Sequence, residues 1–364
     1  MCNCRILHAF FLFSLLFPLR SASADTHTLK MGVMLCLSGD CAEWGTNGFK
    51  GAQLAADELN RRGGILGRRV ELVVQDSKDT IPSSSVTAFR ALMLDPDIQY
   101  IVGPTWTVGG MPVAPLAAKR KDIVMMSPSV GVKEFNETAS NLFNDWPHDE
   151  VATRALARYA AKKGWKKAAI FGSQDPFYMT QTRIFEEEFR VLGGNVAEKV
   201  EPLPDSRELK MEALRIKKSQ PDFVIFTNYQ ADFIAKELHR AGFSTPMLAV
   251  QMEKDRVKAA DGALEGVVFA MYDKPDKDFT KKFKARFQAE PGISADTAYD
   301  AVMLFASAIE KAKTTSTEKT VPILLGTKNF RGASGTFSID EKGAVDKKPV
   351  LWQVKGLDYE RVIE

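Results

Sequence analysis

The stretch LKMGVMLCLSGDCAEWGTNGFKGAQLAADELNRRGGILGRRVELVVQD, residues 29–76, joins two short apolar runs through a longer amphipathic run. The runs LKMGVML (29–35) and VELVVQD (70–76) have the length and the apolar content of strands. Between them, the small and apolar residues of 48–64 recur at helical spacing, and this run ends at two glycines. A strand, a helix and a second strand in this order predict a unit with parallel strands.

The same alternation continues along the chain in two series. In the first series we predict strands at 100–103 and 122–127 and helices near 83–94 and 110–119. The rhythm breaks at 141–147, and a second series follows. Its predicted strands are 168–171, 196–202, 223–226 and 247–249, and its predicted helices are 150–163, 180–192, 208–219 and 231–241. The last segment adds a helix at 297–313 and strands near 336–339 and 350–354, too little for a third domain. We therefore predict an α/β fold with two doubly wound parallel-sheet lobes.

Residues 1–24 have the pattern of a secretory signal peptide. Arg5 begins a weakly basic region, residues 6–17 are almost wholly apolar, and Ala22, Ser23 and Ala24 form a small-residue cleavage site. An apolar run of about a dozen residues is shorter than the ~20 that a membrane-spanning helix needs. We expect cleavage after Ala24 and export to the periplasm.

Composition and charge indicate an ordinary globular protein. The chain has 364 residues, of which 45% are hydrophobic and 26% charged, and it is long enough for two domains. The formal net charge is +3, and it falls to +1 when Arg5 and Arg20 leave with the signal peptide. A nearly neutral protein is a poor partner for nucleic acid or for an acidic surface.

Two cysteines remain after the expected cleavage. Cys2 and Cys4 lie within the signal peptide, whereas Cys36 and Cys41 lie five residues apart in CLSGDC. In an oxidising compartment these two could close a disulfide across the loop, or both could stay free. The sequence alone leaves both alternatives open.

No common catalytic motif is present. The sequence lacks G-x-G-x-x-G after a strand, G-x-x-x-x-G-K-[ST], G-x-S-x-G and H-E-x-x-H. His27, His148 and His239 are widely spaced, and no Cys or carboxylate group stands at metal-ligand spacing. We therefore expect no cofactor and no metal, and we favour a binding protein over an enzyme.

The segment YIVGPTWTVGGMPVAPLA (100–117) places a tryptophan among glycines directly after a predicted strand. Trp106 would expose a large apolar face where the backbone is bare. In open α/β sheets, ligands bind beyond the carboxyl ends of the strands, where helix N-termini offer free N–H groups. Two such lobes face to face predict a small-molecule site in the cleft between them.

Five segments carry a resemblance to a known family. They are residues 31–76, YIVGPTWTVGGMPVAP (100–115), VMMSPS (124–129), FNDWPHDE (143–150) and FRGASGTFSIDEKG (330–343). In their order and spacing they resemble the periplasmic substrate-binding proteins of ABC importers in the leucine, isoleucine and valine binding family. The resemblance spans essentially the whole chain after the signal peptide.

The resemblance implies two lobes joined by a three-crossing hinge, with crossings near Asn144, Tyr272 and Lys348. The implied lobes are 25–144 with 274–348, and 145–273 with 349–364. It further implies a monomer that encloses a small molecule and delivers it to an inner-membrane ABC permease. The alternatives are a sensory binding protein that signals to a separate membrane receptor, and an exported enzyme with titratable groups in its cleft.

The family's pocket can be carried over residue by residue. It falls on Trp44, Trp106, Thr107, Ser127 and Ser129 in the first lobe and on Phe177, Tyr229 and Gln251 in the second. Thr107 matches a serine that donates its hydroxyl to the ligand carboxylate, and Trp44 matches an aromatic residue that covers the ligand. The loop at 103–107 is thus expected to hold a ligand through its amides and a hydroxyl, with Trp106 as a wall.

Two positions depart from the family. Gly131 replaces a threonine that assists with the carboxylate, and Gln251 replaces the glutamate that pairs with the ligand's ammonium group. Because an unpaired buried ammonium is costly, Gln251 weakens the amino-acid interpretation unless Glu253 compensates. We expect a hydrophobic amino acid, or an aromatic or branched carboxylate or amide.

Each candidate residue also has a purely structural interpretation. Trp44 and Trp106 could pack on the surface of a lobe, and the two serines around Pro128 could simply form a turn. Phe177 could fill the core of the second lobe, and Tyr229 could cap the helix that follows it.

Overall fold

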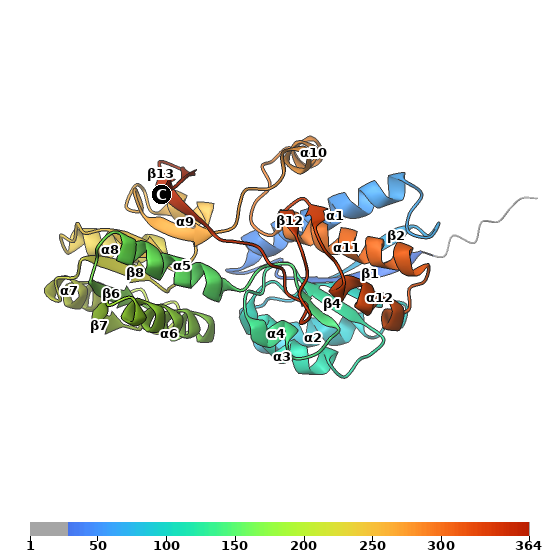
Figure 1. Ribbon diagram of the computed structural model, residues 1–364, viewed down its shortest axis with the longest axis horizontal. Helices are drawn as coiled ribbons and strands as arrows, with labels where there is room; N and C mark the ends of the chain where they lie inside the picture. The colour runs from blue at the N-terminus through green and yellow to red at the C-terminus, as the bar shows by residue number, and fades with distance from the viewer. Residues whose placement is uncertain (1–27, 364) are drawn as a thin grey trace, which may run out of the picture.

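The computed structural model describes residues 28–363, and these form two α/β lobes placed end to end (Figure 1). The predicted signal peptide at 1–24 lies outside the described residues. Among the described helices, none combines the length and the apolar character that a membrane crossing requires.

Within residues 28–363, the first lobe contains a five-stranded parallel sheet of order β2-β1-β3-β4-β5. In this order the chain winds in one direction from β1 to β2 and in the other from β3 onward, so a topological switch lies between β1 and β3. The strands are β1 (Leu29–Leu35), β2 (Val70–Asp76), β3 (Tyr100–Val102), β4 (Val124–Ser127) and β5 (Leu142–Asn144).

The second lobe, over the same described range, contains a seven-stranded sheet of order β14-β13-β10-β9-β8-β6-β7. From β7 to β10 it repeats the strand order of the first lobe, with its switch between β6 and β8, and only β13 and β14 pair antiparallel. The strands are β6 (Lys167–Phe171), β7 (Asn195–Val200), β8 (Phe223–Phe226), β9 (Met247–Ala249), β10 (Val268–Met271), β13 (Val350–Lys355) and β14 (Asp358–Arg361). A separate hairpin consists of β11 (Phe330–Gly332) and β12 (Gly335–Phe337).

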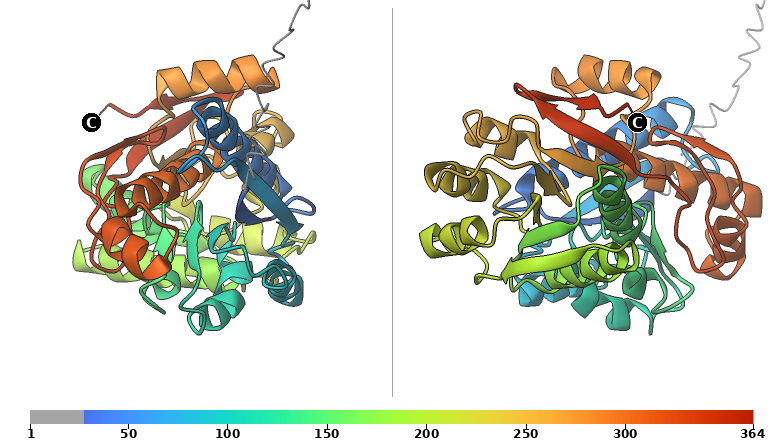
Figure 2. Two further views of the ribbon diagram at one scale, coloured as in Figure 1. Left: turned by 90° about the vertical axis from the view of Figure 1, so that its right-hand side faces the viewer. Right: turned by 60° about the vertical axis from the view of Figure 1, so that its left-hand side comes forward.

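Helices cover both faces of both sheets (Figure 2). Those of the first lobe are α1 (Ala42–Arg61), α2 (Pro82–Leu92), α3 (Thr107–Ala117), α4 (Lys133–Asn136), α10 (Lys277–Phe287), α11 (Ala295–Ala312) and α12 (Thr317–Leu325). Those of the second lobe are α5 (Asp149–Lys162), α6 (Pro176–Val191), α7 (Lys210–Lys218), α8 (Ala231–Arg240) and α9 (Lys254–Ala259).

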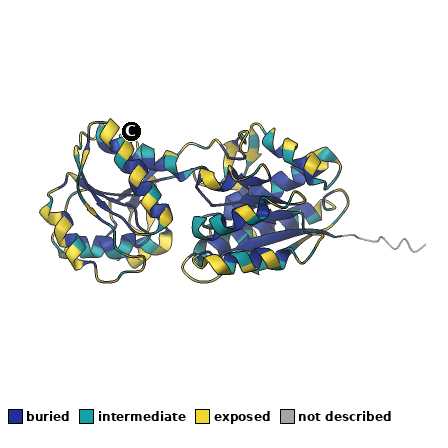
Figure 3. Cartoon of the chain, turned by 90° about the horizontal axis from the view of Figure 1, so that it is seen from below, coloured by how far each residue is buried: buried dark blue, intermediate teal, exposed yellow. Residues whose placement is uncertain are grey.

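Alternating strand residues divide the core between the two faces of each sheet. In β3, Ile101 packs with α2 and α3, whereas Tyr100 and Val102 pack with α1 and α11. In β6, Ile170 packs with α5 and α6, whereas Phe171 packs with α7 and α8. Strands buried on both faces are nearly all apolar, as expected for parallel sheets (Figure 3).

The predicted fold class is confirmed, but several elements were predicted wrongly or missed. The first helix begins at Ala42 rather than at 48, and two of its glycines allow close packing. A Cβ at Gly45 would overlap the Cys36 carbonyl, and one at Gly51 would overlap the Ala295 carbonyl. The elements α4, α9, α10, α12, β5, β10, β11 and β14 were not predicted.

The chain passes between the lobes three times: after β5, after β10 and before β13. Lys347, just before the third crossing, donates from Nζ to the backbone oxygen of Asp145 at 3.1 Å, just after the first. Tyr272, in the second crossing, donates from its hydroxyl to the His148 backbone oxygen at 3.3 Å, and its own backbone oxygen accepts from Trp352 Nε1 at 3.3 Å. The three crossings are therefore tied to one another.

Candidate functional site

A cavity of about 440 Å³ lies between the lobes, lined by residues of both. Its walls come from the loops and helix starts that follow the strands, and therefore from the carboxyl edges of the two sheets. A volume of this size is within the usual range for a small organic molecule. Seven of the predicted site residues line it: Trp44, Trp106, Thr107, Ser129, Phe177, Tyr229 and Gln251.

The topological switches explain why these residues meet. In the first lobe, the loops after β1 and β3 diverge from neighbouring strands and leave a crevice, which Trp44 and Trp106 border. In the second lobe, the loops after β6 and β8 supply Phe177 and Tyr229 in the same way. The cavity therefore lies where the two crevices face one another.

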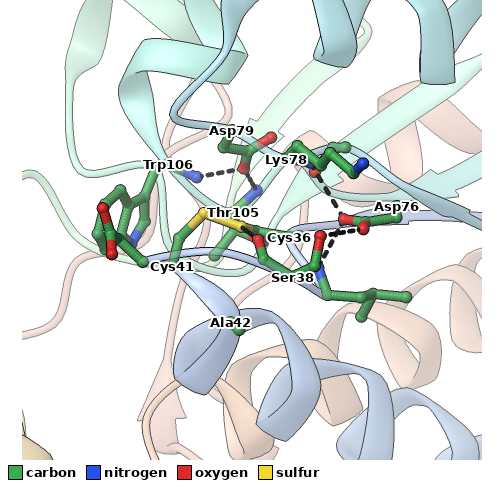
Figure 4. The surroundings of a disulfide bond; sticks show 12 residues. Cys36, Ser38, Cys41, Ala42, Asp76, Lys78, Asp79, Thr105 and Trp106 are labelled. Atoms are coloured by element: carbon green, nitrogen blue, oxygen red, sulfur yellow. Dashed lines mark hydrogen bonds between the residues drawn. A yellow bond between two sulfur atoms is a disulfide. The ribbon is translucent and has the colours of Figure 1, made fainter.

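A disulfide closes the loop after β1. Cys36 and Cys41 are bonded, with their Cα atoms 5.7 Å apart, so of the two alternatives left by the sequence the bonded form is the one observed (Figure 4). Asp76, at the end of β2, holds the same loop by accepting from Leu37 N at 2.8 Å and from Ser38 Oγ at 2.6 Å. The loop is thus fixed by its own disulfide and by Asp76 of the neighbouring strand.

Asp79 organises the tryptophan loop that follows β3. Its Oδ2 accepts hydrogen bonds from Thr105 N at 2.6 Å and from Trp106 N at 2.7 Å (Figure 4). These two loop amides are therefore occupied by protein, contrary to the expectation that they hold a ligand. The first-turn N–H groups of α3, at Thr107 and Val108, have no intrahelical partner, and both residues line the cavity.

Aromatic rings form a continuous wall across the two lobes. Trp44 contacts Trp106 and Trp146, with centroids 6.2 and 5.5 Å apart, and Trp106 contacts Tyr229 at 5.6 Å. Trp44 is buried, so it does not pack on the outer surface of its lobe. Phe177 and Tyr178 add a second ring pair in the other lobe, 5.0 Å apart.

Tyr229 joins the two lobes across the mouth of the cavity. Its hydroxyl donates to the backbone oxygen of Asp40 at 2.9 Å, inside the disulfide loop of the first lobe. The Arg256 guanidinium lies 3.8 Å from the centre of its ring, on the side of α9. Tyr229 is therefore an interlobe contact rather than a cap of α8.

Two predicted residues do not line the cavity. Ser127 is fully buried, donates to the Pro104 oxygen at 2.7 Å and accepts from Val130 N at 2.8 Å, so it stabilises the turn after β4. Glu253 is buried at the start of α9, where burial raises its pKa to about 7 against the lowering effect of nearby Arg256. The expected ligand contacts of Ser127 and Glu253 are therefore wrong for this cavity.

Asp149 is a cavity residue that sequence reasoning missed. It is the first residue of α5, its side chain is buried, and a Cβ on Gly131 would overlap its carboxylate. Trp146 Nε1 donates to Oδ1 at 2.9 Å, and burial raises the pKa of Asp149 to about 7. The segment FNDWPHDE contains this residue, but nothing in the sequence places it against Gly131.

The charges around the cavity are of one sign. Asp40, Asp149, Asp175 and Asp205 line it, whereas no Lys, Arg or His among residues 28–363 does so. Asp40 and Asp205 are exposed at the rim, and Asp175 caps α6 by accepting from Phe177 N at 2.9 Å. In the described part of the chain, no group of three or more His, Cys, Asp or Glu residues could hold a metal ion.

Comparison with known proteins matches residues 28–357 to the family model described as periplasmic binding protein. A Leu/Ile/Val-binding protein, BraC3, of Rhizobium johnstonii is 26% identical over 78% of this chain and 79% of its own length. A leucine-, isoleucine-, valine-, threonine- and alanine-binding protein of Pseudomonas aeruginosa is 24% identical over 89% of this chain and 88% of its own.

Solved structures share the fold. The leucine-binding protein LivK of Thermotoga maritima superimposes with a TM-score of 0.86 at 24% identity, covering 92% of this chain and 98% of that one. A solute-binding protein of an ABC transporter from R. palustris, solved in complex with benzoate, has a TM-score of 0.82 at 20% identity, with 92% and 95% covered.

Proposed function

The chain belongs to the periplasmic binding protein family, and from this we propose that it captures a small organic solute and delivers it to the permease of an ABC importer. The named relatives bind leucine, isoleucine and valine, which supports a role in the uptake of such solutes. We further propose that the protein acts in the periplasm as a monomer after removal of residues 1–24.

The observation that carries the proposal is the aromatic-walled cavity shared by the lobes. A ligand that contacts both lobes stabilises the arrangement in which they are close together. Because binding and closure are then the same event, a membrane partner can distinguish the loaded protein from the empty one by its shape.

The cavity suggests how the two ends of a ligand are held. The Thr107 hydroxyl and the first-turn N–H groups of α3 provide donors for a carboxylate or carbonyl oxygen, which the positive end of the helix also favours. The rings of Trp44, Trp106, Phe177 and Tyr229 provide apolar area for the body. We propose a hydrophobic amino acid, or an aromatic or branched carboxylate or amide.

Native mass spectrometry of the protein as purified tests the proposal directly, since a tightly held solute should appear as a discrete mass above the polypeptide. A thermal-shift screen over amino acids, aromatic acids and amides follows. A ligand at about 100 times its Kd should stabilise the fold by about 2.7 kcal/mol. Trp106→Ala, which removes one wall, should abolish the shift. The proposed function fails if no solute is retained and none stabilises the protein.

Export can be tested separately. Expression of the full chain in a Gram-negative host should yield a periplasmic protein whose N-terminal sequence begins at Asp25. A protein that retains Met1 in the cytoplasm would contradict this part of the proposal.

A further inference from the structure

Ser173 presents an unpaired hydroxyl to the cavity from the second lobe. It lies in the loop after β6, lines the cavity and is only 4% exposed. Among residues 28–363, no group forms a hydrogen bond with its Oγ. A buried hydroxyl without a partner is unfavourable, and most such groups in proteins are paired. Since the protein supplies no partner, one can come only from the cavity.

Gln230 brings a second unpaired polar group to the same loops. It is 4% exposed and lines the cavity, and its side-chain Nε2 has no hydrogen-bond partner in the described part of the chain. Asn228 holds it near Ser173: its Nδ2 donates to the Gly172 oxygen at 2.6 Å, and its Oδ1 accepts from Gln230 N at 2.8 Å. The loops after β6 and β8 are thereby tied together, with their unpaired side chains on the cavity.

Gln251 adds a third uncharged group from the next strand of the sheet. It follows β9, which pairs with β8 as β8 pairs with β6. Its Oε1 accepts from the Tyr178 hydroxyl at 3.4 Å, whereas its Nε2 has no partner among the described residues. We call Ser173, Gln230 and Gln251 the second-lobe polar subsite. A hydroxyl both donates and accepts, and amide N–H groups donate, so the subsite suits an oxygen-bearing group.

The charges around the cavity decide which oxygen-bearing group fits. Asp175 lies two residues from Ser173, and Asp205 lines the same lobe's side of the cavity. Among residues 28–363, no Lys, Arg or His lines the cavity to offset them. An anionic group placed here would be desolvated beside like charges with only neutral donors to hold it. An uncharged hydroxyl or carboxamide avoids this cost.

We propose that the second-lobe polar subsite binds an uncharged hydroxyl or carboxamide on the body of the ligand, in addition to the acidic or carbonyl end held at Thr107. This inference rests on the proposed function and narrows its ligand class. The named relatives bind leucine, isoleucine and valine, whose side chains are hydrocarbons. Such a side chain would leave Ser173 and the two amides unpaired, and a site built to form hydrogen bonds discriminates strongly against an analogue that lacks the matching group.

Isothermal titration calorimetry with pairs of probes tests the assignment. Both members of a pair share the acid end and nearly the same shape, and one carries a hydroxyl or carboxamide where the other has hydrogen or methyl groups. The pairs are 3-phenylpropionate with 3-(4-hydroxyphenyl)propionate, phenylalanine with tyrosine, 4-methylpentanoate with succinamate, and leucine with asparagine. We expect the polar member to bind ten or more times tighter in at least one pair. The pair that shows this preference identifies the group as a hydroxyl or a carboxamide.

Two substitutions locate the preference in the subsite. Ser173→Ala should weaken the preferred polar probe at least threefold and leave its apolar match unaffected. Because Ser173 Oγ has no protein partner, this variant should not lower the melting temperature of the ligand-free protein, as loss of a structural hydrogen bond would. Gln251→Met replaces the amide by an apolar group of similar length and should reduce the preference at least tenfold. Ser244→Ala is the matched control, since Ser244 is exposed in the second lobe and lies outside the cavity.

The outcomes separate this inference from the proposed function. Tighter binding of the apolar member in every pair that binds would overturn the subsite while the binding function stands. A co-purified ligand with no uncharged hydroxyl or carboxamide, or unchanged selectivity in both variants, would do the same. Failure of every probe, together with the absence of a co-purified solute, would overturn both.

Discussion

Thr107 is the first residue of α3, and its side chain lies against the cavity beside the unpaired first-turn N–H groups. A hydrogen bond from its hydroxyl to a charged ligand oxygen should contribute roughly 1.5 to 3 kcal/mol. We therefore predict that Thr107→Val weakens ligand binding by more than tenfold, as measured by calorimetry, while the melting temperature of the ligand-free protein stays nearly the same.

Thr87→Val is the control for this substitution, because Thr87 is an exposed helical residue outside the cavity. It should bind ligand like the unmodified protein. Equal affinity in Thr107→Val would show that the Thr107 hydroxyl does not bind the ligand. It would contradict the proposed donor site for the carboxylate or carbonyl end.

The buried carboxyls of Asp149 and Glu253 predict how stability depends on pH. Burial raises both pKa values to about 7, from ordinary values of 3.8 and 4.5. Between these limits the folded state binds more protons than the unfolded state, so the free energy of unfolding should fall as pH rises from 5 to 8. Each pKa unit corresponds to about 1.4 kcal/mol, so the loss per group should be at least of that order.

Urea denaturation of the ligand-free protein at pH 5, 6.5 and 8 measures this dependence. Asp149→Asn and Glu253→Gln should each make the free energy of unfolding less dependent on pH. Comparing each variant with the unmodified protein isolates the contribution of that one carboxyl. Other groups titrate nearby, such as His148, whose pKa is lowered by burial. A variant with the same pH dependence as the unmodified protein would contradict the role of that residue.

At the scale of elements, the disulfide loop links the fold of the first lobe to the closure of the cavity. Cys36 and Cys41 constrain the loop whose Asp40 oxygen accepts from Tyr229 of the other lobe. Closing so short a loop should stabilise the protein by about 2 kcal/mol. We predict that Cys36→Ser with Cys41→Ser lowers the free energy of unfolding by about this amount and weakens ligand binding several-fold.

Reduction of the unmodified protein with dithiothreitol should reproduce both effects, whereas the double variant should be insensitive to the reductant. If the double variant binds ligand with unaltered affinity, the disulfide serves stability alone and the loop holds its position through Asp76.

The arrangement of elements was largely predictable, and the details of the site were not. Runs of buried strand residues and the loops after them follow directly from apolar patterning, which is why Trp106 could be placed near a cleft. Tyr229 was placed there only through the family resemblance. Gly131 suggested a lost contact, although the Asp149 carboxylate fills its space. A contact between residues so far apart in the sequence leaves no local pattern.

At the scale of the whole molecule, the hinge combines three crossings with buried polar contacts. Lys347 donates to the Asp145 oxygen, and Asp145, Asp296 and Asp300 carry carboxyls whose pKa values are raised by burial and lowered by this lysine. Tyr272 links the second crossing to the start of α5, where Asp149 lies. The cavity and the hinge therefore share neighbouring residues.

The hinge predicts that ligand binding changes the shape of the molecule. In the structure the lobes touch across the cavity through the Tyr229 hydroxyl and the Asp40 oxygen, 2.9 Å apart, and a ligand contacting both lobes should favour this closed arrangement. Small-angle X-ray scattering should therefore give a smaller radius of gyration at ligand saturation than without ligand.

Tyr229→Phe separates the two contributions to closure. It keeps the ring against Trp106 and Arg256 but removes the hydrogen bond to Asp40, which should contribute about 0.5 to 1.5 kcal/mol. The variant should bind ligand two- to tenfold more weakly and show a larger radius of gyration without ligand, yet reach the compact form when saturated. An identical radius with and without ligand, in both proteins, would mean that the lobes do not move on binding, and delivery would then have to depend on a local change at the mouth of the cavity.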